Sequence, residues 1–255
     1  TELAENRDSS HCHGMQTNTT QATPHLTLRR SDERGHADHG WLNAKHSFSF
    51  GDYYDPAHMS FRSLRVINDD RIAPGKGFGM HPHSSMEIFT YIISGELEHK
   101  DSMGNGRVIK SGEFQYMSAG EGIMHSEANP SRENETHLLQ IWITPSHPGG
   151  LPRYADMDTH SLKTKNGLSL FASGDGRDGS QTMRQTAEIF FGQLDPNNSI
   201  GELPDGSFGH HYLHLIKGSL HMDGHTLEPG DAVMIDGKTP AIQAGQSAEF
   251  LYFNL

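Results

Sequence analysis

Apolar and polar residues follow one another in short segments along most of the chain, a pattern typical of β-strands separated by turns. Residues 88–93 and 138–143 are mostly apolar runs of strand length. Phe48 and Phe50 alternate with serines, so one face of that segment is aromatic and the other is polar. We expect both aromatic side chains to lie in a core, with a pocket wall as the alternative.

The second half of the chain repeats this strand pattern at residues 189–194, 212–222 and 227–235. Prolines and glycines cluster between the two halves, at residues 145–152. Proline lacks the backbone donor that a strand ladder needs, and glycine is costly to order. The cluster is therefore predicted to be a domain linker.

The expected organisation is all-β, with an N-terminal barrel at residues 25–145 and a C-terminal barrel at residues 146–255. Glycine is abundant, at 28 of 255 residues, which favours strands joined by many turns. Residues 1–24 are polar, with His11 and His13 in the middle. They bury little apolar surface and are predicted to be an extension rather than part of a core.

Composition narrows the expected partners. The balance of 20 basic against 32 acidic residues gives a net charge of −12, which opposes attraction to a phosphate backbone, so no direct nucleic-acid binding is expected. A single cysteine, Cys12, excludes an internal disulfide framework and fits a reducing compartment. No apolar run reaches the length of a membrane span, and the polar N-terminal segment lacks a signal-peptide core. These features predict a cytoplasmic protein without a membrane partner.

Two pairs of metal-binding residue types stand at i and i+2: His81 with His83, and His125 with Glu127. In an extended strand such a pair projects from one face, so each pair can aim two side chains at one point. Three imidazoles and one carboxylate suit a divalent first-row metal, which predicts a metal site inside a β-barrel. The alternative is a set of core histidines with satisfied hydrogen bonds and a surface carboxylate. Because ligating imidazoles must be neutral, metal loss is expected below a pH of about 6.5.

Several other titratable residues carry weaker signals. His99 lies in a polar strand and is expected to face solvent. Glu87 follows His83 by four residues, so it would share that face only on an unbroken strand. Asp69 and Asp70 end a predicted strand and are expected to form a turn. The histidines of the second half lack the i, i+2 spacing, so a second barrel without metal is predicted.

The chain also carries a series of motifs in a fixed order, at residues 46–50, 53–56, 64–70, 81–83, 101–105, 117–120, 125–127 and 140–143. This series resembles the pirin family, and within it the bacterial pirin-like proteins with quercetin dioxygenase activity. The resemblance runs from about residue 25 to the C-terminus, strong before Arg153 and faint after it. So many ordered matches make it specific.

The resemblance implies a bicupin, with two antiparallel jelly-roll barrels facing each other and metal only in the N-terminal one. The ligands of the family correspond to His81, His83, His125 and Glu127. Many other cupins use the carboxylate of the first motif, here Glu87, as a ligand. The pirin-like pattern favours Glu127 and leaves Glu87 as a supporting or structural residue.

The activity implied by the resemblance is that of a metal-dependent dioxygenase opening the heterocycle of a flavonol such as quercetin. In that reaction Glu127 takes the proton of the 3-hydroxyl group, the metal holds the substrate oxygen, and dioxygen cleaves the ring with release of carbon monoxide. The cofactor is one divalent transition metal ion, with iron as the first expectation and nickel, manganese, cobalt, copper or zinc as alternatives. The partners are a small aromatic substrate and dioxygen.

Two other functions fit the same four ligands. Pirins include transcriptional co-regulators that act through protein partners and use iron as a redox sensor, and other cupin enzymes act on other aromatic or enol substrates. A deep pocket that opens at the metal would favour an enzyme. A closed metal site beneath a large partner surface would favour a regulator.

Overall fold

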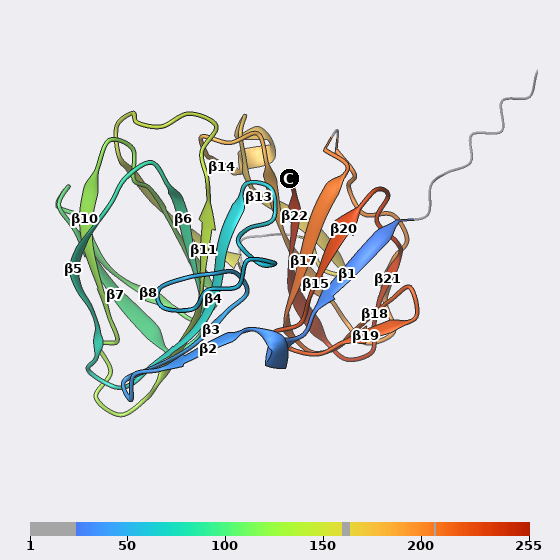
Figure 1. Cartoon of the computed structure of the whole chain (residues 1–255), viewed down its shortest axis with the longest axis horizontal. Helices are drawn as coiled ribbons and strands as arrows, with labels where there is room; N and C mark the ends of the chain where they lie inside the picture. Colours follow the sequence, from blue (N-terminus) through green and yellow to red (C-terminus); the bar gives the residue numbers. More distant parts are fainter. Residues whose placement is uncertain (1–23, 160–163, 207) are drawn as a thin grey trace, which may run out of the picture.

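The computed structural model describes residues 24–159, 164–206 and 208–255, and nearly all of its regular secondary structure is antiparallel β-sheet (Figure 1). Short 3-10 turns, including η1 (Ser31–Glu33) and η3 (Arg177–Gly179), join some of the strands. The expected polar extension lies outside the described residues, apart from Pro24. No helix in the described ranges is long and apolar enough to cross a membrane.

The first barrel consists of a seven-stranded sheet and a four-stranded sheet. The larger sheet has the order β12 (Arg153–Asp158), β9 (Glu113–Ser118), β6 (Glu87–Ser94), β11 (Thr136–Ile143), β4 (Leu64–Ile72), β3 (Leu42–His46) and β2 (Gly35–Asp38). The smaller sheet has the order β5 (Gly77–His83), β10 (Ile123–Ala128), β7 (Glu96–Asp101) and β8 (Gly106–Lys110).

The second barrel also consists of a seven-stranded sheet and a four-stranded sheet. Its larger sheet has the order β1 (His25–Arg29), β20 (Ala232–Asp236), β17 (His210–Lys217), β22 (Ala248–Asn254), β15 (Glu188–Leu194), β13 (Gly167–Ser173) and β14 (Gln181–Thr182). Its smaller sheet has the order β16 (Ser199–Ile200), β21 (Ile242–Ala244), β18 (Leu220–Met222) and β19 (His225–Leu227). The two barrels confirm the expected all-β architecture.

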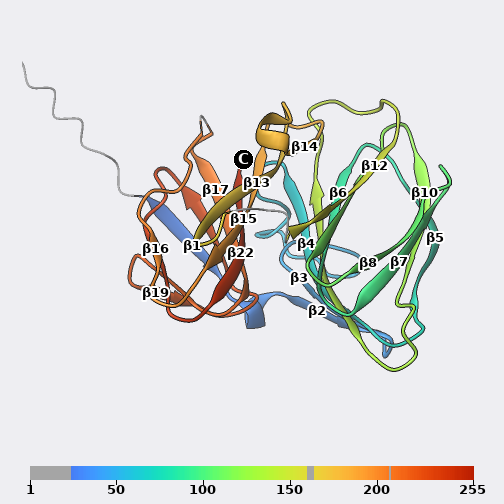
Figure 2. The same ribbon diagram turned by 180° about the vertical axis from the view of Figure 1, so that it is seen from behind.

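The two seven-stranded sheets face each other (Figures 1 and 2). Aromatic side chains from both sheets form the layer between them. Phe114 stacks on Phe171 with ring centroids 4.4 Å apart, and Tyr91 lies 5.6 Å from Phe191. Phe48 is buried in the same layer, as its alternation with serines predicted. Aromatic pairs contribute about 0.5–1.5 kcal/mol beyond the area that they bury, so this layer fixes one barrel against the other.

Two strands belong to the opposite barrel from the one that the expected boundaries gave them. Strand β1 pairs with β20 of the second barrel, where Leu26 and Leu28 pack against its core. Strand β12, which follows the proline and glycine cluster, pairs with β9 of the first barrel. The expected boundaries, residues 25–145 and 146–255, therefore need correction at both strands. We keep the division into two units as a proposal, with β1 in the second unit and β12 in the first.

The turn expected at Asp69 and Asp70 is wrong, because both residues lie inside β4. Asp69 lies on the side of β4 that borders residues of the second barrel. Its carboxylate oxygens lie 3.1 Å from Nη2 of Arg34 and 2.7 Å from Nε2 of His137. Asp70 points to the other side, into the first barrel. A strand accommodates the first carboxylate because two cationic or proton-donating groups compensate it.

Candidate metal centre

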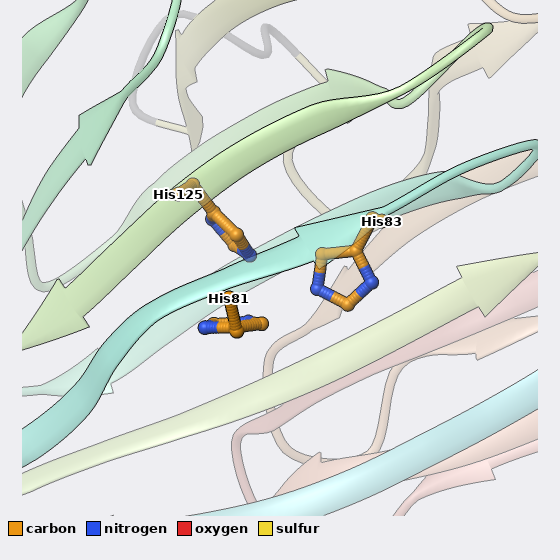
Figure 3. A group of neighbouring side chains, drawn as sticks. All are labelled: His81, His83 and His125. Carbon is orange, nitrogen blue, oxygen red and sulfur yellow. The ribbon is translucent and has the colours of Figure 1, made fainter.

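Three of the four predicted ligands converge inside the first barrel. His81 and His83 lie on β5, and His125 lies directly opposite His81 on the neighbouring antiparallel strand β10. Figure 3 shows the three imidazoles pointing toward one another. Their ring centroids are 4.4 to 4.9 Å apart, and potential ligand nitrogens of all three lie within 4.8 Å of one another. The i, i+2 spacing thus places both β5 histidines on the inner face, as expected.

Hydrogen bonds leave two imidazole nitrogens free for a metal. The Nδ1 of His81 donates to the carbonyl oxygen of Gly79 at 2.8 Å. A carbonyl only accepts, so Nε2 of His81 keeps its lone pair. The Nε2 of His125 is buried and has no hydrogen-bond partner in the described part of the chain. A buried nitrogen without a partner beside two further imidazoles fits a divalent metal ion.

Glu127 lies beside this three-histidine group rather than within it. Along β10, Glu127 follows His125 on the side away from His83. A carboxylate oxygen of Glu127 comes within 4.8 Å of ligand nitrogens of His125 and of His99. The carboxylate is buried, and it accepts hydrogen bonds from Gln140 Nε2 at 2.7 Å and from Thr90 Oγ1 at 3.4 Å. Its role as a fourth ligand stays a proposal.

Burial sets the charge states of the site. It lowers the pKa of His83 to about 4 and that of His125 to about 3, with the neighbouring imidazoles adding to the effect. At neutral pH both rings are therefore neutral, which is the form that binds a metal. Burial also raises the pKa of Glu127 to about 7, against the hydrogen bonds from Gln140 and Thr90. The carboxyl group can thus take up or release a proton near neutral pH.

The expectation that His99 faces solvent is wrong. His99 is fully buried behind His125, with the Nδ1 atoms of the two rings 3.4 Å apart. On its other side, Nε2 of His99 lies 3.4 Å from a carboxylate oxygen of Asp101. The polar composition of β7 suggested exposure, but Leu97, His99 and Asp101 alternate inward. The shared parity with Leu97 was the signal that could have found His99.

These contacts favour one tautomer of His125. Asp101 accepts a hydrogen bond from the Nε2–H group of His99, and Nδ1 of His99 then accepts one from the Nδ1–H group of His125. Both distances are long for hydrogen bonds, so these interactions are weak, and their main effect is on the orientation of the two rings. The arrangement directs the free lone pair of His125 Nε2 toward the other two imidazoles.

Glu87 does not reach the site. Its carboxylate accepts hydrogen bonds from Tyr116, from Ser118 Oγ at 2.6 Å and from the backbone nitrogen of Arg184 at 3.1 Å. Strand β5 ends at His83 and β6 begins at Glu87. The alternation of faces along β5 therefore does not determine which way Glu87 points. Glu87 is a structural residue on the face of β6 that meets the second barrel.

A cavity of about 490 Å³ opens onto the three histidines, within the range usual for small-molecule sites. Its walls are mainly apolar, formed by Trp41, Phe50, Phe78, Ile88 and Trp142. Phe50 is therefore a pocket wall, the alternative to the expected core position. The remaining lining side chains are polar: Asn68, Asp70, His81, His83, His125, Glu127 and Gln140.

A larger cleft of about 840 Å³ lies elsewhere, formed mainly by residues 146–150 and 174–186. Both groups of three potential ligands found among the described residues lie away from it, in the first barrel. Volume alone therefore does not identify the reactive site, and the chemistry of the lining side chains favours the smaller cavity.

Comparison with known proteins agrees with these features. The family model described as Pirin matches residues 27–143, and the model described as quercetinase C-terminal cupin domain matches residues 170–255. A protein of Escherichia coli (strain K12) named quercetin 2,3-dioxygenase is 44% identical over 232 residues, covering 90% of this chain and 98% of that protein.

Solved structures show the same fold. The bacterial pirin YhhW from Escherichia coli, in complex with nickel(II), has 42% sequence identity and a TM-score of 0.85, covering 91% of this chain and 99% of that one. A quercetin 2,3-dioxygenase from Acinetobacter baumannii has 22% identity and a TM-score of 0.70, covering 89% and 84%. The architecture is the expected bicupin, and the chain belongs to the pirin family.

Proposed function

We propose that this protein is a metal-dependent dioxygenase that opens the heterocycle of a flavonol such as quercetin. The observation that carries the proposal is Glu127, a buried carboxyl group with a pKa of about 7 next to three converging imidazoles in an aromatic-walled cavity. The name of the Escherichia coli relative supports this substrate class. The cavity also reaches the half-buried His81 and His83, which supports an enzyme over a regulator with a closed site.

His81, His83, His125 and Glu127 would hold one divalent transition metal. Iron was the first expectation from the sequence, and the nickel complex of the bacterial pirin supports nickel as well. When bound, the metal would act as a Lewis acid that stabilises a negatively charged substrate oxygen.

The side chains of the protein supply the proton transfer and the binding surface. Glu127 accepts the proton of the substrate hydroxyl group, as a positioned carboxylate within reach of that hydroxyl can. Gln140 and Thr90 hold its carboxylate in place. The aromatic walls, among them Trp142 against His83 with ring centroids 4.9 Å apart, bury the flavonol rings and exclude water.

The proposal is tested by anaerobic reconstitution with iron, nickel, manganese, cobalt and copper in turn. Quercetin and oxygen are then added while flavonol absorbance and carbon monoxide are recorded. We expect loss of the flavonol with release of carbon monoxide for at least one metal. If no fully loaded form turns over, the activity is not that of a quercetin dioxygenase.

The pH dependence of metal affinity should distinguish the contribution of Glu127 to metal binding from the contributions of the imidazoles. Because metal-free Glu127 has a pKa of about 7, metal binding below pH 7 must displace its proton. That contribution weakens binding by about tenfold per pH unit as the pH falls. His83 and His125, with pKa values of about 4 and 3, add their own losses only at much lower pH than the sequence-based value near 6.5.

Metal competition titrations from pH 7 to pH 5 measure this contribution. In Glu127→Gln the corresponding tenfold decline per pH unit should disappear. An unchanged slope in that variant would show that Glu127 does not exchange its proton for the metal.

A further inference from the structure

One carboxyl group in the cavity remains without an assigned role. Asp70 lies on β4 and lines the cavity together with Asn68, two residues earlier on the same face. The residue is only 3% exposed. Its Oδ1 atom has no hydrogen-bond partner within the described ranges.

The carboxylate of the neighbouring Asp69 has charged or hydrogen-bonding partners, whereas that of Asp70 does not in the described part of the chain. Asp69 faces Arg34 and His137, which hold its pKa well below the usual range in spite of burial. Asp70 has no such partners, and burial, followed by the charges of Asp69 and Glu127, raises its pKa to about 8. An uncompensated buried polar group reduces stability, so its presence in the wall of a binding cavity points to a ligand.

Two other polar side chains of the wall already make hydrogen bonds within the protein. Asn68 Oδ1 lies 2.8 Å from Nδ1 of His46, and Gln140 donates to Glu127. Asp70 is therefore the cavity carboxyl group that remains available to a bound molecule. A carboxyl group can accept a hydrogen bond from a hydroxyl group and, when neutral, can also donate one.

We propose that Asp70 forms a second polar subsite, which hydrogen-bonds a substrate hydroxyl group other than the one next to Glu127 and the histidines. This inference rests on the proposed function and narrows its substrate class to aromatic enols with an additional hydroxyl group. Apolar walls bind many planar compounds of similar size. A buried polar group discriminates among them, because a ligand without the matching hydroxyl leaves it unpaired.

The chain offers a built-in probe for this subsite. Its two tryptophans, Trp41 and Trp142, both line the cavity. Energy transfer from these residues to a bound flavonol reports occupancy directly. Titrations use the metal-loaded protein without oxygen, with quercetin as the polyhydroxylated ligand and 3-hydroxyflavone as the ligand that lacks the additional hydroxyl groups.

We expect Asp70→Ala to weaken quercetin binding by about tenfold and 3-hydroxyflavone binding by less than about twofold. Asp70→Asn, whose amide can still donate and accept, should bind quercetin within about threefold of the unaltered protein. Asp69→Asn is the control on the opposite face of β4 and should change neither affinity by more than about twofold.

An equal effect of Asp70→Ala on both ligands, or no effect on either, would overturn the subsite while leaving the proposed function in place. Failure of the unaltered protein to bind either flavonol would overturn the proposed substrate class and the subsite together. Thermal unfolding supplies a separate test: because an amide in place of an unpaired carboxyl group breaks no hydrogen bond, the melting temperature of Asp70→Asn should not fall by more than about 2 °C. A melting temperature several degrees lower would mean that Asp70 has a structural partner, against the inference.

Discussion

His83→Ala is expected to lower the affinity for divalent metal by at least about 100-fold while leaving the second barrel folded. His83 supplies one of three imidazoles whose ligand nitrogens lie within 4.8 Å of one another. Removing it leaves two imidazoles and Glu127, and a loss of 100-fold corresponds to about 2.7 kcal/mol of binding free energy. Elemental analysis after dialysis and a metal competition titration measure the effect.

The second barrel should be unaffected because His83 lies in the smaller sheet of the first barrel, away from the layer between the barrels. Hydrogen exchange of β17 and β22 amides should therefore match that of the unaltered protein. His36→Ala, at an exposed position of β2, is the matched control and should retain its metal. Full metal content in His83→Ala would exclude this residue from the ligand set.

Strand geometry predicted that His81 and His83 share one face of their strand. His81 and His83 share a face because side chains repeat every two residues along a strand, and that period survives in β5 at these two positions. Between Phe78 and His81, however, β5 carries one residue more than β10 has opposite it. Glu127 consequently pairs with Phe78. Local periodicity cannot reveal such an irregularity, so the relation of Glu127 to the three histidines needed the structure.

His99 was assigned to the surface from the polar composition of its strand, and Asp70 was assigned to a turn at the end of a strand. In a closed barrel every second residue faces inward whatever its polarity. The inward side chains therefore include His99 on β7 and Asp70 on β4, although polar residues are usually expected at the surface. The exception is informative, because both residues line or support the cavity in which a ligand would supply compensation.

Strand pairing was the other part that the sequence could not decide. The first barrel was expected to begin at residue 25, yet Leu26 and Leu28 fit the core of either barrel equally well by composition. Their partner β20 lies some 200 residues later in the chain, a contact that no local pattern encodes. Because β1 belongs to the second barrel and β12 to the first, the chain crosses between the barrels twice, before β2 and after β12.

Glu127→Gln is expected to reduce turnover of quercetin by about 10²- to 10⁴-fold, the usual contribution of a general base. The amide keeps the size of the side chain and an oxygen that can face the metal, but it cannot accept the substrate proton at neutral pH. Because Glu127 is also a proposed ligand, metal content must be measured in the same samples. Rates are then compared per bound metal, with initial absorbance changes and carbon monoxide as readouts.

Two controls separate the base from a structural effect. Glu133→Gln changes the same functional group at an exposed position and should leave turnover unaltered. Glu127→Asp keeps a carboxylate but withdraws it from Gln140, so it should recover part of the rate lost in Glu127→Gln. If Glu127→Gln binds metal normally and turns over at the unaltered rate, the proton of the substrate is taken by another group. Asp70, the other buried carboxyl group of the cavity, would then be the first to replace.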